Sequence, residues 1–552
     1  MEEQEWIVTL HRKEDLEDFY NDMETPGGDL YIPDRSVDLF ARRPISRNTH
    51  YMLNDEEAEQ LRKDPRVLDV QLDPLKLGGE VGLYWEQTGD FLKSTTINST
   101  DKNWGLKRVI DGQTTAGWGS GSNETKRLSN EYITTTSSGK NVDVVIVDNH
   151  INPDHPEFAV NADGTGGSRV NQIDWFGLYA EAAGLTVTGA YDYSDIAGNH
   201  GTHVAGTACG NTQGWARDAN IYNMEFAYSG SNSPAGWTLY VFDLLRAFHL
   251  NKPINPETGR RNPTITNHSW GYYTRPYTNY LYEINRVQYK GSSTYLTGLT
   301  DSEKKTILEA KGVPVILGSA LWRMNLSLNS VNVDVQDAID DGVIVVAAAG
   351  NHYWQVATPE STHWNNAFWT DGRSSAWFHA KGSTPACPDF GSIVVGNVSS
   401  AGDEWKASTS NFGLGVDIWA PGTDIISAAA DTNTASYTAD PRNSYYRIYS
   451  TSGTSMASPQ VCGILACHAE QNPRLTQAEA KTYLINTSTK NQIGSVGSDY
   501  GDYNWFGDEG NNRYLHYVKN RPLSGAAIPR GNFRDRLTSG VTYPRPRIRR
   551  RG

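Results

Sequence analysis

The sequence predicts an α/β protein in which helices flank a central parallel sheet, with a small α+β domain in front of it. Three short runs, at 142–147 (VDVVIV), 342–347 (GVIVVA) and 392–396 (SIVVG), are rich in β-branched residues and lack regular polar alternation. Such runs are typical of strands buried on both faces of a parallel sheet. A helix-like segment at 334–341 directly precedes the second run, which favours β-α-β units.

Residues 1–75 contain the expected elements of the small α+β domain. Residues 6–10 (WIVTL) form a β-prone run, and residues 13–23 have the spacing of a surface helix. A second helix is expected over 54–63, where an Asn is followed three residues later by a Glu in the pattern of a capping box. Residues 67–72 (VLDVQL) alternate as a half-buried strand does.

Composition divides the rest of the chain into three regions. Residues 76–102 are rich in Gly, Thr and Ser and are interpreted as a linker, 103–490 hold the expected sheet, and 491–552 form a C-terminal extension. The last ten residues contain five arginines, Arg545, Arg547, Arg549, Arg550 and Arg551. An end of this kind could contact nucleic acid or an acidic partner, and the alternative that we favour is a solvated tail.

Composition also excludes several classes of protein. The 63 acidic residues outnumber the 49 Lys and Arg, giving a net charge of −14, whereas a general nucleic-acid surface needs a basic surplus. No window approaches 18 consecutive apolar residues, so we expect no membrane span, and four cysteines in 552 residues cannot form a disulfide framework. The acidic start MEEQEW lacks the pattern of a secretory signal, which favours a cytoplasmic or virion-associated location over classical secretion.

Three segments could supply the groups that serine catalysis requires, namely a nucleophile, a base and an acid that orients the base. Asp148 ends the first buried run, and the carboxyl end of a parallel strand is where α/β proteins bind ligands. Residues 198–206 (GNHGTHVAG) offer two histidines. Residues 452–459 (SGTSMASP) place Ser455 among small residues before a helix-like stretch, whose N-terminal N–H groups favour a developing oxyanion.

These segments resemble the motifs of the subtilisin-like serine proteases, or subtilases, in the family's order Asp, His, Ser. The matching stretches read IVDNHINPDHPEF, GNHGTHVAG and SGTSMASP, a fourth reads VVAAAGN, and the resemblance spans roughly 103–485. It implies a subtilisin-like fold in which Asp148 orients, His200 is the base and Ser455 is the nucleophile, while His203 is structural. It also implies that Asn351 donates its side-chain amide to the oxyanion hole, together with the backbone N–H of Ser455.

The resemblance further implies a substrate-binding groove. Residues 265–271 (ITNHSWG) are similar to the strand that binds the substrate backbone in the family. The residues implied to bind substrate are Ser269, Trp270, Gly271, Ala349 and Gly350. Trp270 is bulkier than the Leu usual in the family, which leaves the shape of the pocket open.

Two features depart from the family pattern. His150 lies where the family usually has a small residue or Gly, and we expect it to face solvent from a loop; the alternative is a position near the site that alters its pH response. An apparent insertion at 272–330 contains Tyr272, Tyr273, Tyr277, Tyr280, Tyr282, Tyr289 and Tyr295. Tyrosine-rich surfaces suit recognition of a partner, and the alternative that we favour is that these rings pack the insertion onto the body.

The N-terminal domain resembles the inhibitor-like propeptides of subtilases, through WIVTL and NDEEAEQLRKDPRVLDVQLD. Such propeptides have a ferredoxin-like β-α-β-β-α-β fold, act as folding templates and leave their C-terminal strand in the active-site cleft. The resemblance therefore implies a zymogen that cuts itself between about residues 74 and 100. The alternative is an accessory domain that is never removed.

Calcium commonly binds members of this family, which need no other cofactor. Glu157 falls where many members have an Asp ligand, but the loop at 207–218 is short and lacks the usual further ligands. We therefore expect that calcium site to be absent; calcium binding elsewhere stays open, with no site assigned.

Two functions of different classes fit these observations. The first is a serine endopeptidase that hydrolyses peptide bonds, with protein or peptide substrates and its own N-terminal domain as partners. The second is a structural or assembly component, for example of a virus particle, built on a subtilase body. The intact triad residues favour the first.

Overall fold

The computed structural model separates the chain into two units, Met1–Tyr517 and Val518–Gly552. It describes residues 3–518 except 33–38, 44, 73–78, 84–103, 113–134, 136, 188–190, 194–197, 226–236, 275–282, 316–322, 372–373, 400–403, 431–436 and 495–510. The Arg-rich end of the sequence lies outside these residues. Among the helices of the described part, none is both long and apolar enough to cross a membrane.

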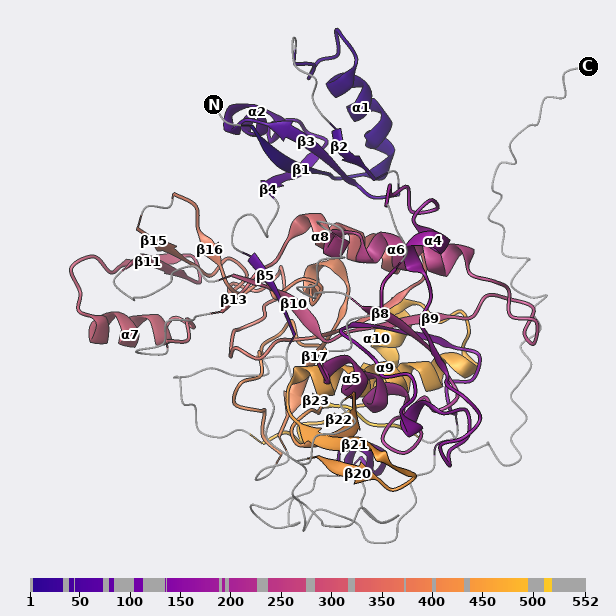
Figure 1. Cartoon of the computed structure of the whole chain (residues 1–552). Coiled ribbons are helices and arrows are strands. Elements are labelled where there is room, and N and C mark those ends of the chain that lie inside the picture. The colour runs from indigo at the N-terminus through magenta and orange to yellow at the C-terminus, as the bar shows by residue number, and fades with distance from the viewer. Residues whose placement is uncertain are drawn as a thin grey trace, which may run out of the picture. The chain divides into compact units, whose positions relative to one another are not determined.

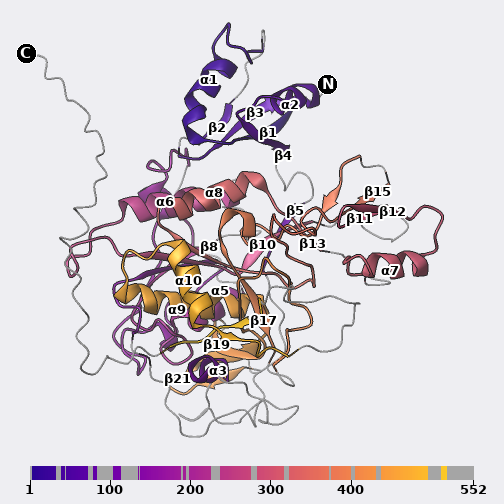
Figure 2. The ribbon, with the colours of Figure 1, turned by 180° about the vertical axis from the view of Figure 1, so that it is seen from behind.

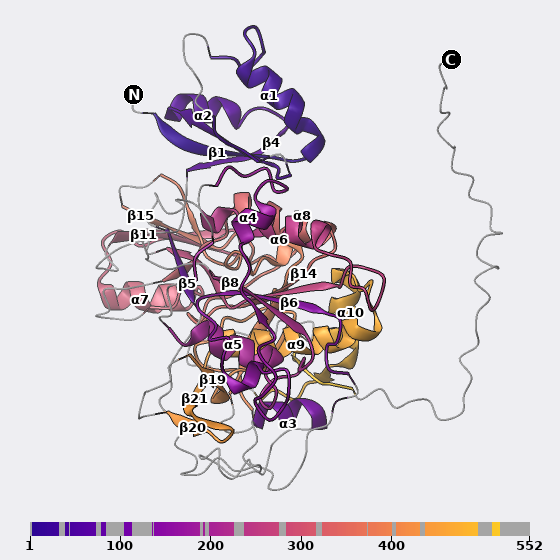
Figure 3. The same cartoon turned by 45° about the vertical axis from the view of Figure 1, so that its right-hand side comes forward.

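The N-terminal domain is a four-stranded antiparallel sheet with two helices (Figure 3). Its elements are β1 (Gln4–Leu10), α1 (Leu16–Glu24), β2 (Leu39–Arg42), β3 (Asn48–Leu53), α2 (Asp55–Leu61) and β4 (Val67–Leu72). The strand order β2-β3-β1-β4 is that of a ferredoxin-like split β-α-β fold. Asn54 and Glu57 form the expected capping box at the start of α2.

Both faces of this sheet are covered. On β1, Trp6, Val8 and Leu10 face the domain's own helices and belong to its core. Ile7 points to the opposite face, as alternation along a strand requires, and packs into a core cluster of the main body. The N-terminal domain therefore has a core of its own and also contributes Ile7 to the core of the body.

The main body is built on a nine-stranded sheet of order β22-β23-β18-β17-β14-β9-β6-β8-β7 (Figure 1). Its strands are β6 (Asp143–Asp148), β7 (Val170–Asn171), β8 (Asn220–Glu225), β9 (Thr264–His268), β14 (Ile344–Ala348), β17 (Ile393–Val398), β18 (Ile418–Pro421), β22 (Thr489–Lys490) and β23 (Arg513–Tyr514). All neighbouring pairs are parallel except β22 with β23. The three predicted runs form β6, β14 and β17, and all are buried.

Helices cover both faces of this sheet, which explains why its strands are apolar without alternation (Figure 2). Val144 and Ile146 of β6 belong to a cluster with α5 (His200–Cys209), α9 (Thr454–Gln471) and α10 (Gln477–Thr487). Val145 and Val147 belong to the opposite cluster, with α4 (Trp175–Tyr179), α6 (Val241–Asn251) and α8 (Asn329–Asp340). The four cysteines are buried free thiols.

The predicted insertion, 272–330, forms a small unit together with residues 367–378, and this unit has a core of its own. Strands β11 (Ile284–Tyr289), β12 (Ser292–Tyr295), β15 (Ala367–Thr370) and β16 (Trp377–Phe378) make a four-stranded sheet, accompanied by α7 (Asp301–Glu309). Its tyrosines differ in exposure: Tyr272 and Tyr273 are buried, whereas Tyr295 is 71% exposed. Tyr277, Tyr280 and Tyr282 lie outside the described residues.

The body continues past residue 490, where the sequence suggested its end. Strand β23 joins the sheet beside β18, and the Leu515 N–H donates to the carbonyl oxygen of Trp419 at 2.8 Å. The Tyr517 N–H donates to Val109 O in α3 (Trp104–Asp111) at 2.9 Å. The boundary drawn from composition was too early, because a two-residue strand has no recognisable periodicity.

Candidate active site

Asp148 and His200 form a buried pair at the carboxyl end of the sheet. Asp148 is the last residue of β6 and His200 is the first residue of α5. His200 Nδ1 lies 2.7 Å from Asp148 Oδ1, and both side chains are fully buried. The Asn149 N–H also donates to Asp148 Oδ1, at 2.8 Å. The carboxylate thus fixes the orientation of the imidazole, as a triad acid must.

Ser455 reaches the same edge of the sheet from a different helix. It is the second residue of α9, and its Oγ donates to the Ser269 carbonyl oxygen at 3.1 Å. The Ser269 hydroxyl in turn donates to Ser455 O at 2.8 Å. Because β6 and β9 pair in parallel with Val147 opposite His268, the next residues, Asp148 and Ser269, are neighbours. The structure therefore brings the predicted nucleophile to the strand end that carries the acid.

Helices α5 and α9 pack closely along their length. A Cβ added at Gly463 would lie 2.4 Å from the carbonyl oxygen of Ala208, so only a glycine permits this approach. Ala208 and Gly463 each lie eight residues beyond the predicted catalytic residue of their own helix. The close contact thus couples the helix that carries His200 to the helix that carries Ser455.

Asn351 lies just after β14, beside the start of α9. Its Oδ1 accepts hydrogen bonds from both the N–H and the hydroxyl of Thr454, each at 2.9 Å. Its Nδ2 is buried and has no hydrogen-bond partner among the described residues. Thr454, which holds the Asn351 side chain, directly precedes Ser455. A buried amide donor without a partner at this place is suited to stabilise a negative charge that develops on a substrate oxygen.

The predicted groove is occupied by a strand of this same chain. Ser269 immediately precedes β10 (Trp270–Thr274), which pairs in antiparallel register with β5 (Gly79–Leu83). Leu83 lies opposite Trp270, and Gly82 opposite Gly271. The Trp270 side chain is fully buried in the core cluster below α6 and α8, so it does not fill the groove.

The other two predicted groove residues belong to the segment that follows β14. Ala349 and Gly350 follow β14, and the Gly350 N–H donates to the Thr454 hydroxyl at 3.1 Å. The Ala349 carbonyl oxygen accepts a hydrogen bond from Asn411 Nδ2 at 2.6 Å. This segment is therefore fixed to the start of α9.

The prediction for His150 was wrong. His150 is 6% exposed, and its Nδ1 lies 2.9 Å from the Glu225 carboxylate. The reason is the register of β6 with β8, which places Glu225 opposite Asp148 and so beside the following loop. That loop is also tied to α5, since Asn149 Oδ1 accepts from the Gly201 N–H and Thr202 Oγ1 accepts from the Asn152 N–H. None of these contacts of the loop after β6 was predicted from the sequence.

His203, the second histidine of the motif, lies in the packed interior. Its Nε2 lies 2.9 Å from the Ile425 carbonyl oxygen, and burial lowers its pKa to about 3. A histidine that stays neutral there contributes packing and a hydrogen bond.

Glu157 is held by donors on all sides. The Arg442 guanidinium lies 2.5 Å from its Oε1, which also accepts from the Thr212 hydroxyl. Its Oε2 accepts from the N–H groups of Thr212 and Gln213 at 3.0 and 3.1 Å. A calcium ion needs oxygen ligands, and here donors surround the carboxylate, so these residues do not fit the ion. No cluster of three or more His, Cys, Asp or Glu side chains able to hold a metal ion occurs among the described residues.

Comparisons with known proteins identify the family of this chain. The profile of the subtilase family (Peptidase_S8) matches residues 139–502. Subtilisin-like protease 3 of Arthroderma otae is 28% identical over 65% of this chain and 61% of its own length, and alkaline protease 1 of Emericella nidulans is 26% identical over 66% and 60%. A subtilisin-like protease of Coccidioides posadasii is 24% identical over 81% of this chain and 65% of its own length. The chain thus spans about three fifths to two thirds of these curated relatives.

Two solved structures are also similar. A cold-adapted subtilisin-like serine proteinase matches 77% of this chain and 99% of its own, with a TM-score of 0.43 and 22% identity. Fervidolysin from Fervidobacterium pennivorans matches 94% of this chain and 60% of its own, with a TM-score of 0.46 and 16% identity. The family profile covers well over half of the sequence, including all three predicted triad residues. The chain belongs to the subtilase family.

Proposed function

We propose that this protein is a serine endopeptidase. The observation that carries the proposal is the buried Asp148–His200 pair, 2.7 Å apart, at the sheet edge where Ser455 contacts Ser269. Ser455 Oγ attacks the peptide carbonyl while His200 takes its proton and later passes it to the leaving amine. Asp148 holds the imidazole, and the amide of Asn351 and the N–H of Ser455 stabilise the tetrahedral oxyanion.

The proposal extends to self-processing, with the N-terminal domain as the first product. Strand β5 pairs with β10 as a bound peptide would, and Leu83 lies opposite Trp270. Trp270 directly follows Ser269, whose carbonyl oxygen accepts from Ser455 Oγ, so β5 runs toward the nucleophile and Leu83 is its last described residue. The bond cut would then lie after Leu83 and before about residue 100.

The test uses the purified full-length protein and its Ser455→Ala variant. The parent should react with a fluorophosphonate probe and release a fragment whose new N-terminus, read by mass spectrometry, lies after Leu83 and before about residue 100. The variant should neither react nor be cut. Equal processing in both proteins would refute the assignment of Ser455, and a reactive but permanently uncut chain would instead support the accessory-domain alternative.

A further inference from the structure

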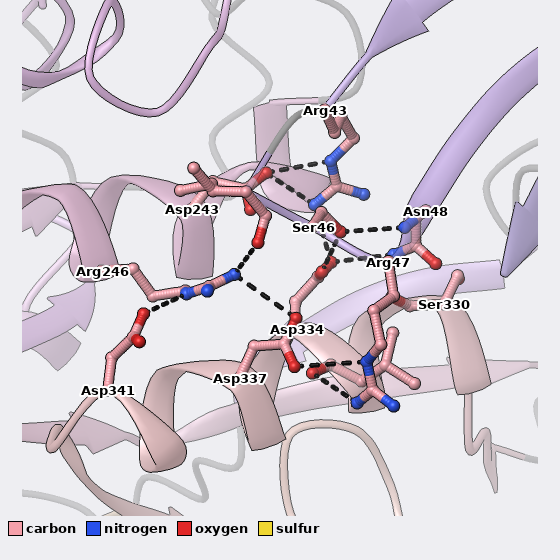
Figure 4. Close-up of polar contacts among 12 residues, drawn as sticks. Arg43, Ser46, Arg47, Asn48, Asp243, Arg246, Ser330, Asp334, Asp337 and Asp341 are labelled. Atoms are coloured by element: carbon pink, nitrogen blue, oxygen red, sulfur yellow. Dashed lines mark hydrogen bonds and ion pairs between the residues drawn. The ribbon is translucent and has the colours of Figure 1, made fainter. Parts of the chain in front are cut away.

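Arg43, in the loop that joins β2 to β3, enters the body between helices α6 and α8 (Figure 4). Its Nε and Nη2 donate to Asp243 Oδ2 at 2.9 and 2.7 Å, and Nη2 also donates to Asp334 Oδ2 at 2.6 Å. Asp243 belongs to α6 and Asp334 to α8. All three side chains are fully buried. One guanidinium of the N-terminal domain therefore bridges two carboxylates that lie on separate helices of the body.

Two further residues of this loop, and Asn48 at the start of β3, extend this contact. The Ser46 hydroxyl donates to Asp334 Oδ1, and Asn48 Nδ2 donates to Asp334 Oδ2 at 3.1 Å. Arg47 forms an ion pair with Asp337 at 3.2 Å. Arg43, Ser46 and Arg47 are the residues of this loop with donor side chains, and each contacts an acceptor on α8.

The body supplies most of the negative charge at this contact. Arg246 pairs with Asp341 at 2.7 Å and with Asp337 at 3.4 Å, and it donates to the Ile45 carbonyl oxygen. We call the set Arg43, Arg47, Asp243, Arg246, Asp334, Asp337 and Asp341 the Arg43 cluster (Figure 4). Within it the body contributes four carboxylates and one guanidinium, and the N-terminal domain contributes two guanidinium groups. Separating the domain would leave the body's part of the cluster with an excess of negative charge.

Apolar contact accompanies the charges. Ile7 is buried in the core cluster that α6 and α8 share, and Ile45 packs partly buried against the same cluster. Apolar burial alone would accept many partners, but a pair of fully buried carboxylates demands a cation that supplies several donors in fixed directions. A planar guanidinium meets that demand, whereas a neutral side chain would leave both carboxylates buried without a counter-charge.

We propose that Asp243 and Asp334 form an arginine-binding socket, which keeps the N-terminal domain bound to the body after the chain between them is cut. The cut enzyme then stays blocked, with β5 on β10, until Arg43 leaves the socket. This inference rests on the proposed function for its biological meaning, but the binding itself does not require catalysis.

The experiment therefore measures binding in a protein that cannot cut itself. The full-length Ser455→Ala chain receives a recognition site for a site-specific protease within residues 84–103, and added protease then nicks it. Dissociation of the N-terminal fragment is followed by immobilising the fragment through its N-terminus and recording loss of the body. Arg43→Met should speed dissociation at least about 100-fold, because removing one partner of a buried ion pair leaves the other charge uncompensated. Arg12→Met is the matched control, since Arg12 pairs with Asp15 on the surface of the same domain, and it should leave the rate unchanged.

A second variant distinguishes loss of the socket from misfolding of the N-terminal domain. Asp243→Asn combined with Asp334→Asn alters only the body, and it should also speed dissociation. Adding Arg43→Met to that double variant should cost much less than Arg43→Met alone, because the socket is already neutral. An Arg43→Met rate within threefold of the Arg12→Met rate, or fully additive losses, would overturn the socket. Failure of the unmodified chain to cut itself would count against the proposed function and leave the socket measurement intact.

Discussion

Replacing Arg442 by Met tests whether an arginine supplies the positive charge at Glu157. Arg442 lies in the turn between β20 (Thr438–Asp440) and β21 (Asn443–Thr451), and it also binds Asp440. Burial alone would raise the pKa of Glu157, but Arg442 and the Thr212 donors outweigh it and hold that pKa below the ordinary value. The carboxylate is therefore charged in the folded protein, and Arg442→Met would leave that charge in the interior.

The magnitude follows from the contacts that remain. Breaking a buried ion pair typically costs about 3–5 kcal/mol. Glu157 would keep its hydrogen bonds from Thr212 and Gln213, so we expect the lower end, about 3 kcal/mol. A cooperative unit of about 400 residues unfolds with an entropy near 0.8 kcal/mol/K, so Tm should fall by about 3–4 °C.

The assay is thermal unfolding of the Ser455→Ala protein, which avoids self-digestion. Arg442→Met should lower Tm, a chelator should not, and Arg442→Met combined with Glu157→Gln should recover most of the loss because the buried charge is gone. Arg447→Met is the control, since Arg447 on the adjacent strand donates to backbone carbonyl oxygens. The reasoning is refuted if Arg442→Met melts with the control, or if a chelator lowers Tm as much as the variant does. Since the folded pKa of Glu157 is depressed, its stabilisation is present at neutral pH and is lost on acidification below the ordinary value.

A further prediction concerns the site. Asn351→Ala removes the buried amide donor beside Ser455, so kcat on a peptide substrate should fall about 10²–10³-fold with KM little changed; a change in KM alone would contradict the assignment.

Local signals in the sequence predicted the elements that hold the site. The run that became β6 is apolar on both sides because helices cover both faces of the sheet, and Asp148 at its end could be placed from that pattern alone. The capping box at Asn54 was equally local. The four family motifs lie on β6, α5, β14 and α9 or directly beside them. The order of these motifs along the chain was therefore enough to predict that the candidate residues lie close together.

The features that could not be predicted depend on partners far apart in the chain. Glu157 and Arg442 are separated by 285 positions, and Arg43 and Asp334 by 291. His150 was misplaced for the same reason, since its partner Glu225 becomes a neighbour only through the register of two parallel strands. No local sequence pattern predicts such pairs, because each of these residues is of a type that is common in surface loops and surface helices.

The last strand of the body has a consequence for the order in which the protein is made. Strand β23 and Tyr517 contact β18 and the early helix α3, yet the ribosome adds them well after Ser455. A growing chain that already contains all three predicted triad residues therefore still lacks the edge of its sheet. The N-terminal domain, which has its own core, can fold long before then and await the body. Under the proposed self-processing, the first cut is therefore expected only after β23 has joined the sheet.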